Sequence, residues 1–187
     1  MRSGCRQTGQ RKRGDAVTAS ILSDRRDRVS GMATWAEFEA EVPEFARFVT
    51  ERLTAHKFLT MATIRADGGP RISGTEIVLS GGELWLAGMT GARRWADLRR
   101  DPRIAIHGRP DDDATWRGDA KIGGRAVEVD EAGRGAFAAG LPEGSPGEFE
   151  LFRIDVTEAT AVRLEDPPVV LIVESWRPGE PLKRVDR

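Results

Sequence analysis

The stretch ELWLAGMTGARRWADLRRDPRIAI, residues 83–106, contains two apolar segments separated by an arginine-rich one. The apolar pattern of residues 83–89 predicts a strand, and that of residues 103–108 predicts another. Between them, Gly91 to Arg100 predicts a short helix, which ends at Asp101-Pro102 because the residue before a proline avoids the helical conformation. The stretch therefore predicts a strand, a helix and a second strand in direct succession.

Five arginines lie in this stretch, and they fall at different places on the predicted helix. Arg93 and Arg94 occupy its first turn, where free backbone N–H groups and the positive end of the helix dipole favour an anion. Arg99 and Arg100 occupy its last turn, where we expect them to complement the free carbonyls and to face water. Arg103 begins the next strand. From the residues alone, a phosphate site at Arg93 and Arg94 and a solvated helix face are equally good interpretations.

Two further strands are predicted before this stretch. Residues 57–66, KFLTMATIRA, and residues 70–80, PRISGTEIVLS, are separated by the turn residues DGG. Pro70 suits the first position of a strand, where no ladder hydrogen bond from its nitrogen is needed. The two segments therefore predict a hairpin.

Two helices are predicted before the hairpin. Thr34 and Glu37 have the spacing of a capping box, and Pro43 suits the first turn of a second helix. Their apolar stripes consist of Trp35, Phe38, Val42, Phe45, Phe48, Val49 and Leu53. We expect these side chains to form core contacts with a sheet.

Beyond residue 108, the pattern predicts mainly strands. Residues 116–129 predict a fifth strand with a bulge at Gly123-Gly124, followed by a helix over residues 130–140. Strands resume at residues 149–164 and 169–176. Many short, mostly sequential strands with one inserted helix predict a mainly β fold with flanking helices, closed as an antiparallel barrel.

The N-terminal segment differs in composition from the rest. Residues 1–31 are polar and basic without sustained periodicity, so we expect them to be either disordered or a mis-assigned leader, with the true start at Met32 or Val29. The sequence RQTGQRKR also allows the alternative of a nucleic-acid-binding arm. The folded domain is expected to comprise residues 32–187.

Composition excludes several classes of function. The chain has 29 basic and 30 acidic side chains, which gives no reason to expect nucleic acid or an anionic membrane as its main partner. Cys5 is the single cysteine, so no intrachain disulfide can form and a cytoplasmic location is expected. The longest apolar runs, such as residues 169–173, are too short to span a membrane.

The candidate catalytic and metal-binding side chains exclude further classes of function. His56 and His107 are the two histidines, and neither has neighbours at metal-ligand spacing, so no metal site is expected. His107 is expected to be a partly buried, hydrogen-bonding side chain. Neither a nucleophile elbow nor a P-loop is present. Residues 111–113, three aspartates, are expected to lie in a solvated loop.

Three successive segments resemble the pyridoxamine 5'-phosphate oxidase-like family of FMN- and F420-binding split barrels. They are ATIRADGGPRI, the opening stretch and KIGGRAVEV. The resemblance extends over residues 45–165, and its most specific element is Arg94, Leu98 and Asp101-Pro102, which match the helix pattern of the family. It implies an antiparallel split barrel and a homodimer in which the cofactor site lies between two barrels.

The resemblance also implies which residues bind the cofactor. The basic pair Arg93 and Arg94 would bind its phosphate. The residues expected around the ring and the ribityl chain are Ser73, Gly74, Thr75, Ala87, Gly88, Met89 and Thr90. Near the C-terminus, Trp176 and Arg184 would be the counterparts of a tryptophan and an arginine that lie close to the flavin, with packing of an edge strand as the alternative.

Three positions depart from the family pattern. Ser73 stands where the name-giving oxidases have an arginine, Val78 where they have the lysine that binds the substrate phosphate, and Ala92 where a serine precedes the basic pair. We therefore do not expect pyridoxamine phosphate to be the substrate.

The resemblance implies an FMN- or deazaflavin F420-dependent oxidoreductase that acts on an unidentified small molecule by hydride transfer. FMN is the first choice, and F420 is the second because its acidic tail would suit a basic groove formed with Arg71 and Lys57. The alternative is a non-catalytic flavin- or haem-binding protein. A small nucleic-acid-binding barrel would need exposed aromatic residues such as Trp85 and Trp116, which we expect instead in core or dimer contacts.

Overall fold

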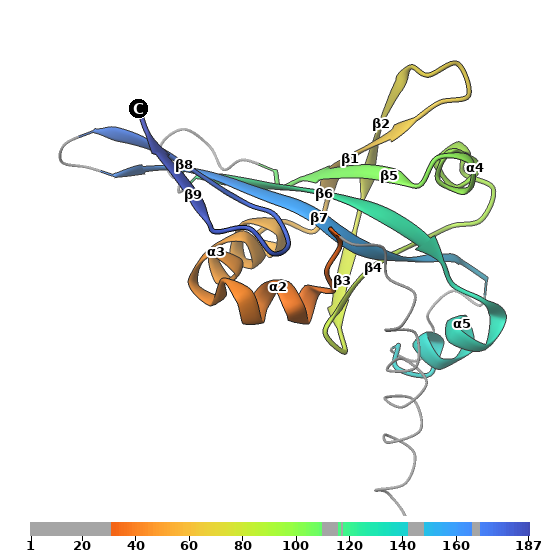
Figure 1. Cartoon of the computed structure of the whole chain (residues 1–187). Helices are drawn as coiled ribbons and strands as arrows, with labels where there is room; N and C mark the ends of the chain where they lie inside the picture. Colours follow the sequence, from red (N-terminus) through yellow and green to blue (C-terminus); the bar gives the residue numbers. More distant parts are fainter. Residues whose placement is uncertain (1–30, 110–115, 117, 142–147, 166–168) are drawn as a thin grey trace, which may run out of the picture. The chain divides into compact units, whose positions relative to one another are not determined.

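The computed structural model of the chain describes residues 31–109, 116, 118–141, 148–165 and 169–187 (Figure 1). Residues 1–30 of the N-terminal segment and residues 111–113 lie outside these ranges, so the structure does not bear on the expectations for them. The helices and strands are α2 (Trp35–Glu41), α3 (Pro43–Thr54), β1 (Leu59–Ile64), β2 (Pro70–Thr75), β3 (Ile77–Ser80), β4 (Glu83–Gly88), α4 (Arg93–Arg100), β5 (Arg103–His107), β6 (Asp119–Glu128), α5 (Glu131–Ala138), β7 (Glu150–Glu165), β8 (Val170–Trp176) and β9 (Lys183–Asp186).

Local sequence signals account for both N-terminal helices. The Thr34 hydroxyl accepts a hydrogen bond from the Glu37 backbone N–H at 3.0 Å, and the Glu37 carboxylate accepts one from the Thr34 backbone N–H at 2.8 Å. These two bonds form the predicted capping box of α2. Pro43 is the first residue of α3, as predicted. Both helices lie beneath the sheet in Figure 1 and pack against β7.

The strands form one antiparallel sheet in the order β2-β1-β5-β6-β7-β4-β3, with β8 paired to β7 and β9 paired to β8. The two ends of the seven-strand path, β2 and β3, are consecutive in the chain and separated only by Glu76. The path therefore closes on itself, which gives the antiparallel barrel predicted from the sequence.

The division at Glu76 corrects the prediction of one strand over residues 70–80. Within these residues, β2 pairs with β1, whereas β3 pairs with β4. At the junction the Thr75 hydroxyl donates to the Glu76 carbonyl oxygen at 3.2 Å. The alternation of side chains continues through the division, so the sequence pattern could not reveal that the segment changes its partner strand.

The longest strand, β7, holds the two parts of the sheet together. It pairs with β6 along most of its length, with β4 through residues 150–154 and with β8 through residues 159–165. The predicted bulge in β6 is confirmed, because the register with β7 shifts between Gly123 and Gly124. A Cβ atom on Gly124 would lie 2.7 Å from the Asp155 carbonyl oxygen, so this close approach requires glycine.

The core lies between the two N-terminal helices and the inner face of the sheet. Its centre is Phe38, whose ring centroid is 5.2 Å from that of Trp35, 6.0 Å from that of Phe45 and 4.5 Å from that of Trp176. All four rings are buried. The core thus includes Trp176, on the strand β8 close to the C-terminus.

Candidate functional site

The first turn of α4 has no side-chain cap. Its N-cap residue, Ala92, has no side chain that can accept from the first-turn N–H groups, and the first turn contains no acidic residue. Arg93 is exposed and Arg94 is half-buried at this end of the helix. The helix therefore begins with two cations and with free N–H groups, which is the arrangement that attracts an anion.

Arg94 is held in place by neutral groups. Its guanidinium carbon lies 4.4 Å from the centroid of the Trp95 ring, and its Nη1 donates to the Gly74 carbonyl oxygen at 3.2 Å. A Cβ atom on Gly88 would lie 2.8 Å from Arg94 Nη2, so the glycine makes room for this side chain. Gly74 and Gly88 are thus brought together with Arg94.

The charge of Arg94 is not neutralised by a carboxylate. Its Nε is buried and has no hydrogen-bond partner among the described residues, none of whose carboxylates forms an ion pair with it. Burial lowers the pKa of Arg94, although a guanidinium stays protonated at neutral pH. An anion bound at this position would compensate for the desolvation of Arg94.

The other three arginines of the stretch have carboxylate partners, and Arg99 and Arg100 are exposed, as expected, but also ion-paired. Arg99 binds Glu128 on β6 and Glu150 on β7, and these two carboxylates raise its pKa. Arg100 binds Asp97 and the Ile64 carbonyl oxygen. Arg103 binds Asp101 at 2.6 Å. Arg99 thus links the end of α4 to β6 and β7, and Arg100 links it to β1.

The two residues considered for a wider basic groove are also paired. Arg71 Nε lies 2.6 Å from an oxygen of Asp97, and Lys57 Nζ lies 3.6 Å from an oxygen of Glu76. Of the cations proposed for an anion site, Arg93 and Arg94 are thus the two that form no ion pair with a described carboxylate.

The remaining residues expected near the cofactor lie on two strands beside α4. Ser73 and Thr75 belong to β2, with Thr75 buried and Ser73 half-buried. Ala87 ends β4 together with Gly88, and the exposed Met89 and Thr90 follow it. The Trp95 indole N–H donates to the Met89 carbonyl oxygen at 2.8 Å, which ties this loop to α4.

The two C-terminal candidates lie elsewhere in the chain. Trp176 is 1% exposed and packs on Phe38 in the core. Arg184 is on β9, where it binds Asp186 at 2.9 Å and lies 3.6 Å from Glu165. Figure 1 shows β9 and α4 at opposite ends of the sheet. Within one chain, the structure therefore does not bring Trp176 and Arg184 to Arg94.

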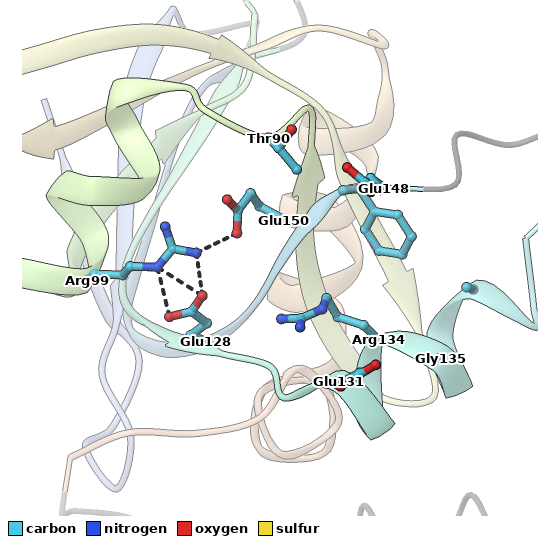
Figure 2. A pocket seen from close by; sticks show the side chains of 10 residues that line it. Thr90, Arg99, Glu128, Glu131, Arg134, Gly135, Glu148 and Glu150 are labelled. Carbon is cyan, nitrogen blue, oxygen red and sulfur yellow. Dashed lines mark hydrogen bonds and ion pairs between the residues drawn. The ribbon is translucent and has the colours of Figure 1, made fainter.

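A cavity of about 590 Å³ lies beside α4 and was not predicted from the sequence (Figure 2). It adjoins Thr90 and lies between α4, α5 and the ends of β6 and β7. Its charged lining residues are Arg99, Glu128, Glu131, Arg134, Glu148 and Glu150. Since these residues come from four separate segments of the chain, no local sequence motif predicts the cavity.

The described residues can be assessed for metal-ligand groups and for membrane-spanning helices. In this part of the chain, no three His, Cys, Asp or Glu side chains are grouped so that they could hold a metal ion. The helices described here are all too short or too polar to cross a membrane. His107 is partly exposed, and its Nε2 lies 3.6 Å from an oxygen of Asp119.

Solved structures share this fold at low sequence identity. An FMN binding protein related to pyridoxamine 5'-phosphate oxidase, from Nostoc punctiforme, has a TM-score of 0.54 at 14% identity, over 77% of this chain and 95% of its own. PhzG from Burkholderia lata, in complex with tetrahydrophenazine-1-carboxylic acid, has a TM-score of 0.53 at 13% identity, over 82% and 92%. A protein related to general stress protein 26, from Clostridium acetobutylicum, has a TM-score of 0.52 at 15% identity, over 64% and 89%.

Sequence comparison identifies the family. A search of curated proteins found no significant match. The family profile described as "Pyridoxamine 5'-phosphate oxidase" matches residues 42–163, which is more than half of the chain and includes β1 to β6 and most of β7. The mainly antiparallel split barrel predicted from the sequence is thereby confirmed, and the chain belongs to the pyridoxamine 5'-phosphate oxidase family.

Proposed function

We propose that this protein is an FMN-dependent oxidoreductase that binds the phosphate of its cofactor with Arg94 and Arg93. The observation that carries the proposal is the half-buried guanidinium of Arg94, which has no carboxylate partner in the described part of the chain and lies at an uncapped helix start. Membership of a family whose fold is shared by an FMN binding protein supports the same conclusion.

The chemistry of the donor set fits a phosphate monoester. A phosphate offers several oxygens to the N–H groups of the first turn and to the two guanidinium groups. Trp95 and Gly74 hold Arg94 before any ligand arrives, so little side-chain entropy is lost on binding. Gly74 leaves space beside this anchor for the rest of the cofactor, because a Cβ atom there would meet no other atom within 4 Å.

Bound FMN supplies the hydride chemistry through its ring. The chain then has three tasks: to hold the phosphate, to orient the ring with backbone groups of Ser73 to Thr75 and of Ala87 to Thr90, and to admit a small-molecule substrate. Val78 stands where the name-giving oxidases have the lysine that binds the substrate phosphate, and Ser73 stands where they have an arginine, so we propose a different substrate.

The ion pairs favour FMN over F420. The longer acidic tail of F420 would require further free cations, and Arg71 and Lys57 would have to supply them. Both already bind carboxylates, at Asp97 and Glu76. Arg93 and Arg94 suffice for a single phosphate.

A parallel titration tests the proposed cofactor. We expect the purified protein to show a flavin spectrum, and the apo protein to bind FMN more tightly than riboflavin, F420 or haem, because only FMN combines the flavin ring with one terminal phosphate. Flavin fluorescence and absorbance changes measure the four affinities. Failure of both FMN and F420 to bind at micromolar concentration would overturn the proposal, and tighter binding of haem would support the non-catalytic alternative.

We also propose that the protein is a homodimer. Residues Ile72, Ala62, Ala105 and Gly123 lie opposite one another across β2, β1, β5 and β6 and point away from the barrel interior. Ile72 is 67% exposed. A second copy can cover the part of this row formed by Ile72, Ala62 and Ala105, whereas the Glu158 side chain on the neighbouring strand β7 already lies over Gly123.

The mass in solution tests the homodimer. We expect light scattering coupled to size-exclusion chromatography to give about twice the chain mass of 20.5 kDa. Ile72→Lys should shift the protein toward the monomer because it places a charge in the apolar row. The matched control is Phe58→Lys, which changes another exposed apolar side chain, outside this row. A monomeric wild-type protein would contradict the proposal.

A further inference from the structure

We infer that Asp97 is a positioning residue for Arg94: by binding Arg71 it fixes α4 against β2 at the place where Arg94 meets its ligand. The inference rests on the proposed function, since it concerns how the phosphate-binding arginine is held. Asp97 itself touches neither the ligand nor Arg94 in this arrangement, so its effect on binding is indirect.

The carboxylate of Asp97 is the meeting point of three elements. Asp97 is 3% exposed on α4, and one of its oxygens accepts hydrogen bonds from the Thr63 hydroxyl of β1 at 3.0 Å and from Arg71 Nε of β2 at 2.6 Å. Its other oxygen lies 3.4 Å from Arg100 Nη1. Burial raises the pKa of Asp97, but hydrogen bonds from Arg71, Thr63 and Arg100 and the charge of Arg71 outweigh it and lower the pKa below its usual value. The group is therefore charged at neutral pH.

This centre is one helical turn from the phosphate-binding arginine. Asp97 follows Arg94 by three residues on α4, and Arg71 precedes Gly74 by three residues on β2. Two links thus connect the same helix to the same strand: the ion pair between Asp97 and Arg71, and the hydrogen bond from Arg94 to the Gly74 carbonyl oxygen. Loss of the first link lets α4 shift along β2, and the second link then no longer holds Arg94 at a fixed distance.

A purely stabilising role explains this ion pair poorly. Desolvation of two charges offsets much of their attraction, so a buried ion pair often adds no more stability than apolar side chains of the same volume. A directional pair does fix the relative position of the two elements, and displacements of about 1 Å already weaken a binding site. Asp97 pairs with Arg71 on β2 and with Arg100 on its own helix, so the two guanidinium groups share this one carboxylate.

The ratio of FMN affinity to riboflavin affinity separates positioning from general stability. Both ligands share the ring and the ribityl chain, so a loss of overall packing lowers both affinities, whereas a displaced Arg94 lowers only that for FMN. We expect Asp97→Asn and Arg71→Met each to reduce the ratio by about five- to twentyfold. Asp101→Asn is the matched control, because it removes an ion-paired carboxylate at the other end of α4, away from β2, and should leave the ratio unchanged.

A double-mutant cycle with Arg94→Ala completes the test. If Asp97 acts through Arg94, then Asp97→Asn should reduce the ratio no further once Arg94 is absent. Equal losses for FMN and riboflavin in both single variants, or an unchanged ratio, would overturn the inference. Should Asp97→Asn not fold, as a thermal scan would show, Arg71→Met decides alone. Failure of the proposed function has a different signature, because the wild-type protein itself would then bind FMN and riboflavin equally.

Discussion

Replacement of Trp176 by alanine is expected to lower the free energy of unfolding by about 3–5 kcal/mol, the range observed when a large aromatic side chain is removed from a protein core. Trp176 is 1% exposed, and its ring lies 4.5 Å from that of Phe38 at the centre of the core. The cavity left by the substitution would be bordered by rings that α2 and α3 hold in place, so it could collapse only in part. Urea or thermal denaturation measures the change.

Two controls separate packing from cofactor contact. Trp176→Phe keeps an aromatic ring and removes an indole N–H that has no hydrogen-bond partner among the described residues, so we expect a loss below about 1.5 kcal/mol. Arg184→Ala changes an exposed side chain of the same C-terminal segment, and its effect should stay within about 0.5 kcal/mol. A Trp176→Ala protein of normal stability that binds FMN weakly would contradict the core assignment and favour the contact implied by the family resemblance.

The case of Trp176 illustrates what sequence could not predict about the tail. The segment ESWRPGEPLKRVDR has the composition of the family tail, and composition alone cannot distinguish a tryptophan that faces a ligand from one that faces the core. The decisive fact is that β8 pairs with β7 over the face where α2 lies, which places Trp176 against Phe38. The short strand β9, which carries Arg184, was not predicted at all because its apolar pattern is weak.

Local signals were sufficient for most helices and strands. The capping box at Thr34, Pro43, the Asp101-Pro102 stop and the bulge at Gly123-Gly124 are each determined by a few neighbouring residues, and the structure confirms all four. The division of residues 70–80 depends instead on which strand lies beside each half. That information is held by residues far away in the sequence.

The same distinction applies to the arginines. The positions of Arg93 and Arg94 in the first turn of α4 could be predicted, because the start and end of a short helix are local properties. The partners of Arg99, Glu128 and Glu150, are 29 and 51 residues further along the chain. Arg71 and Asp97, which bind each other, are 26 residues apart. Only the closed sheet brings these groups together, so the sequence could not show which arginines remain free to bind a ligand.

This division of the arginines leads to the second large expected effect, on cofactor affinity. Arg94→Ala is expected to weaken FMN binding by about 1.5–3 kcal/mol, the range for a hydrogen bond to a charged group, which is about 10- to 150-fold in the dissociation constant. Riboflavin lacks the phosphate, so its affinity should change little. Arg93 is more exposed than Arg94, and its replacement by alanine should have a smaller effect because solvent screens its charge.

The matched control for Arg94→Ala is Arg47→Ala, which removes the same charge from an exposed position on α3 and should leave FMN affinity unchanged. Stability offers an independent check, since removal of a desolvated guanidinium without a carboxylate partner should not weaken the fold in proportion to the loss of affinity. Increasing ionic strength should weaken FMN binding to the wild-type protein more than binding to Arg94→Ala, because screening acts on the charge that the variant lacks. If Arg94→Ala instead weakened FMN and riboflavin equally, the phosphate would have to be bound elsewhere, and the first turn of α4 would be a solvated helix end.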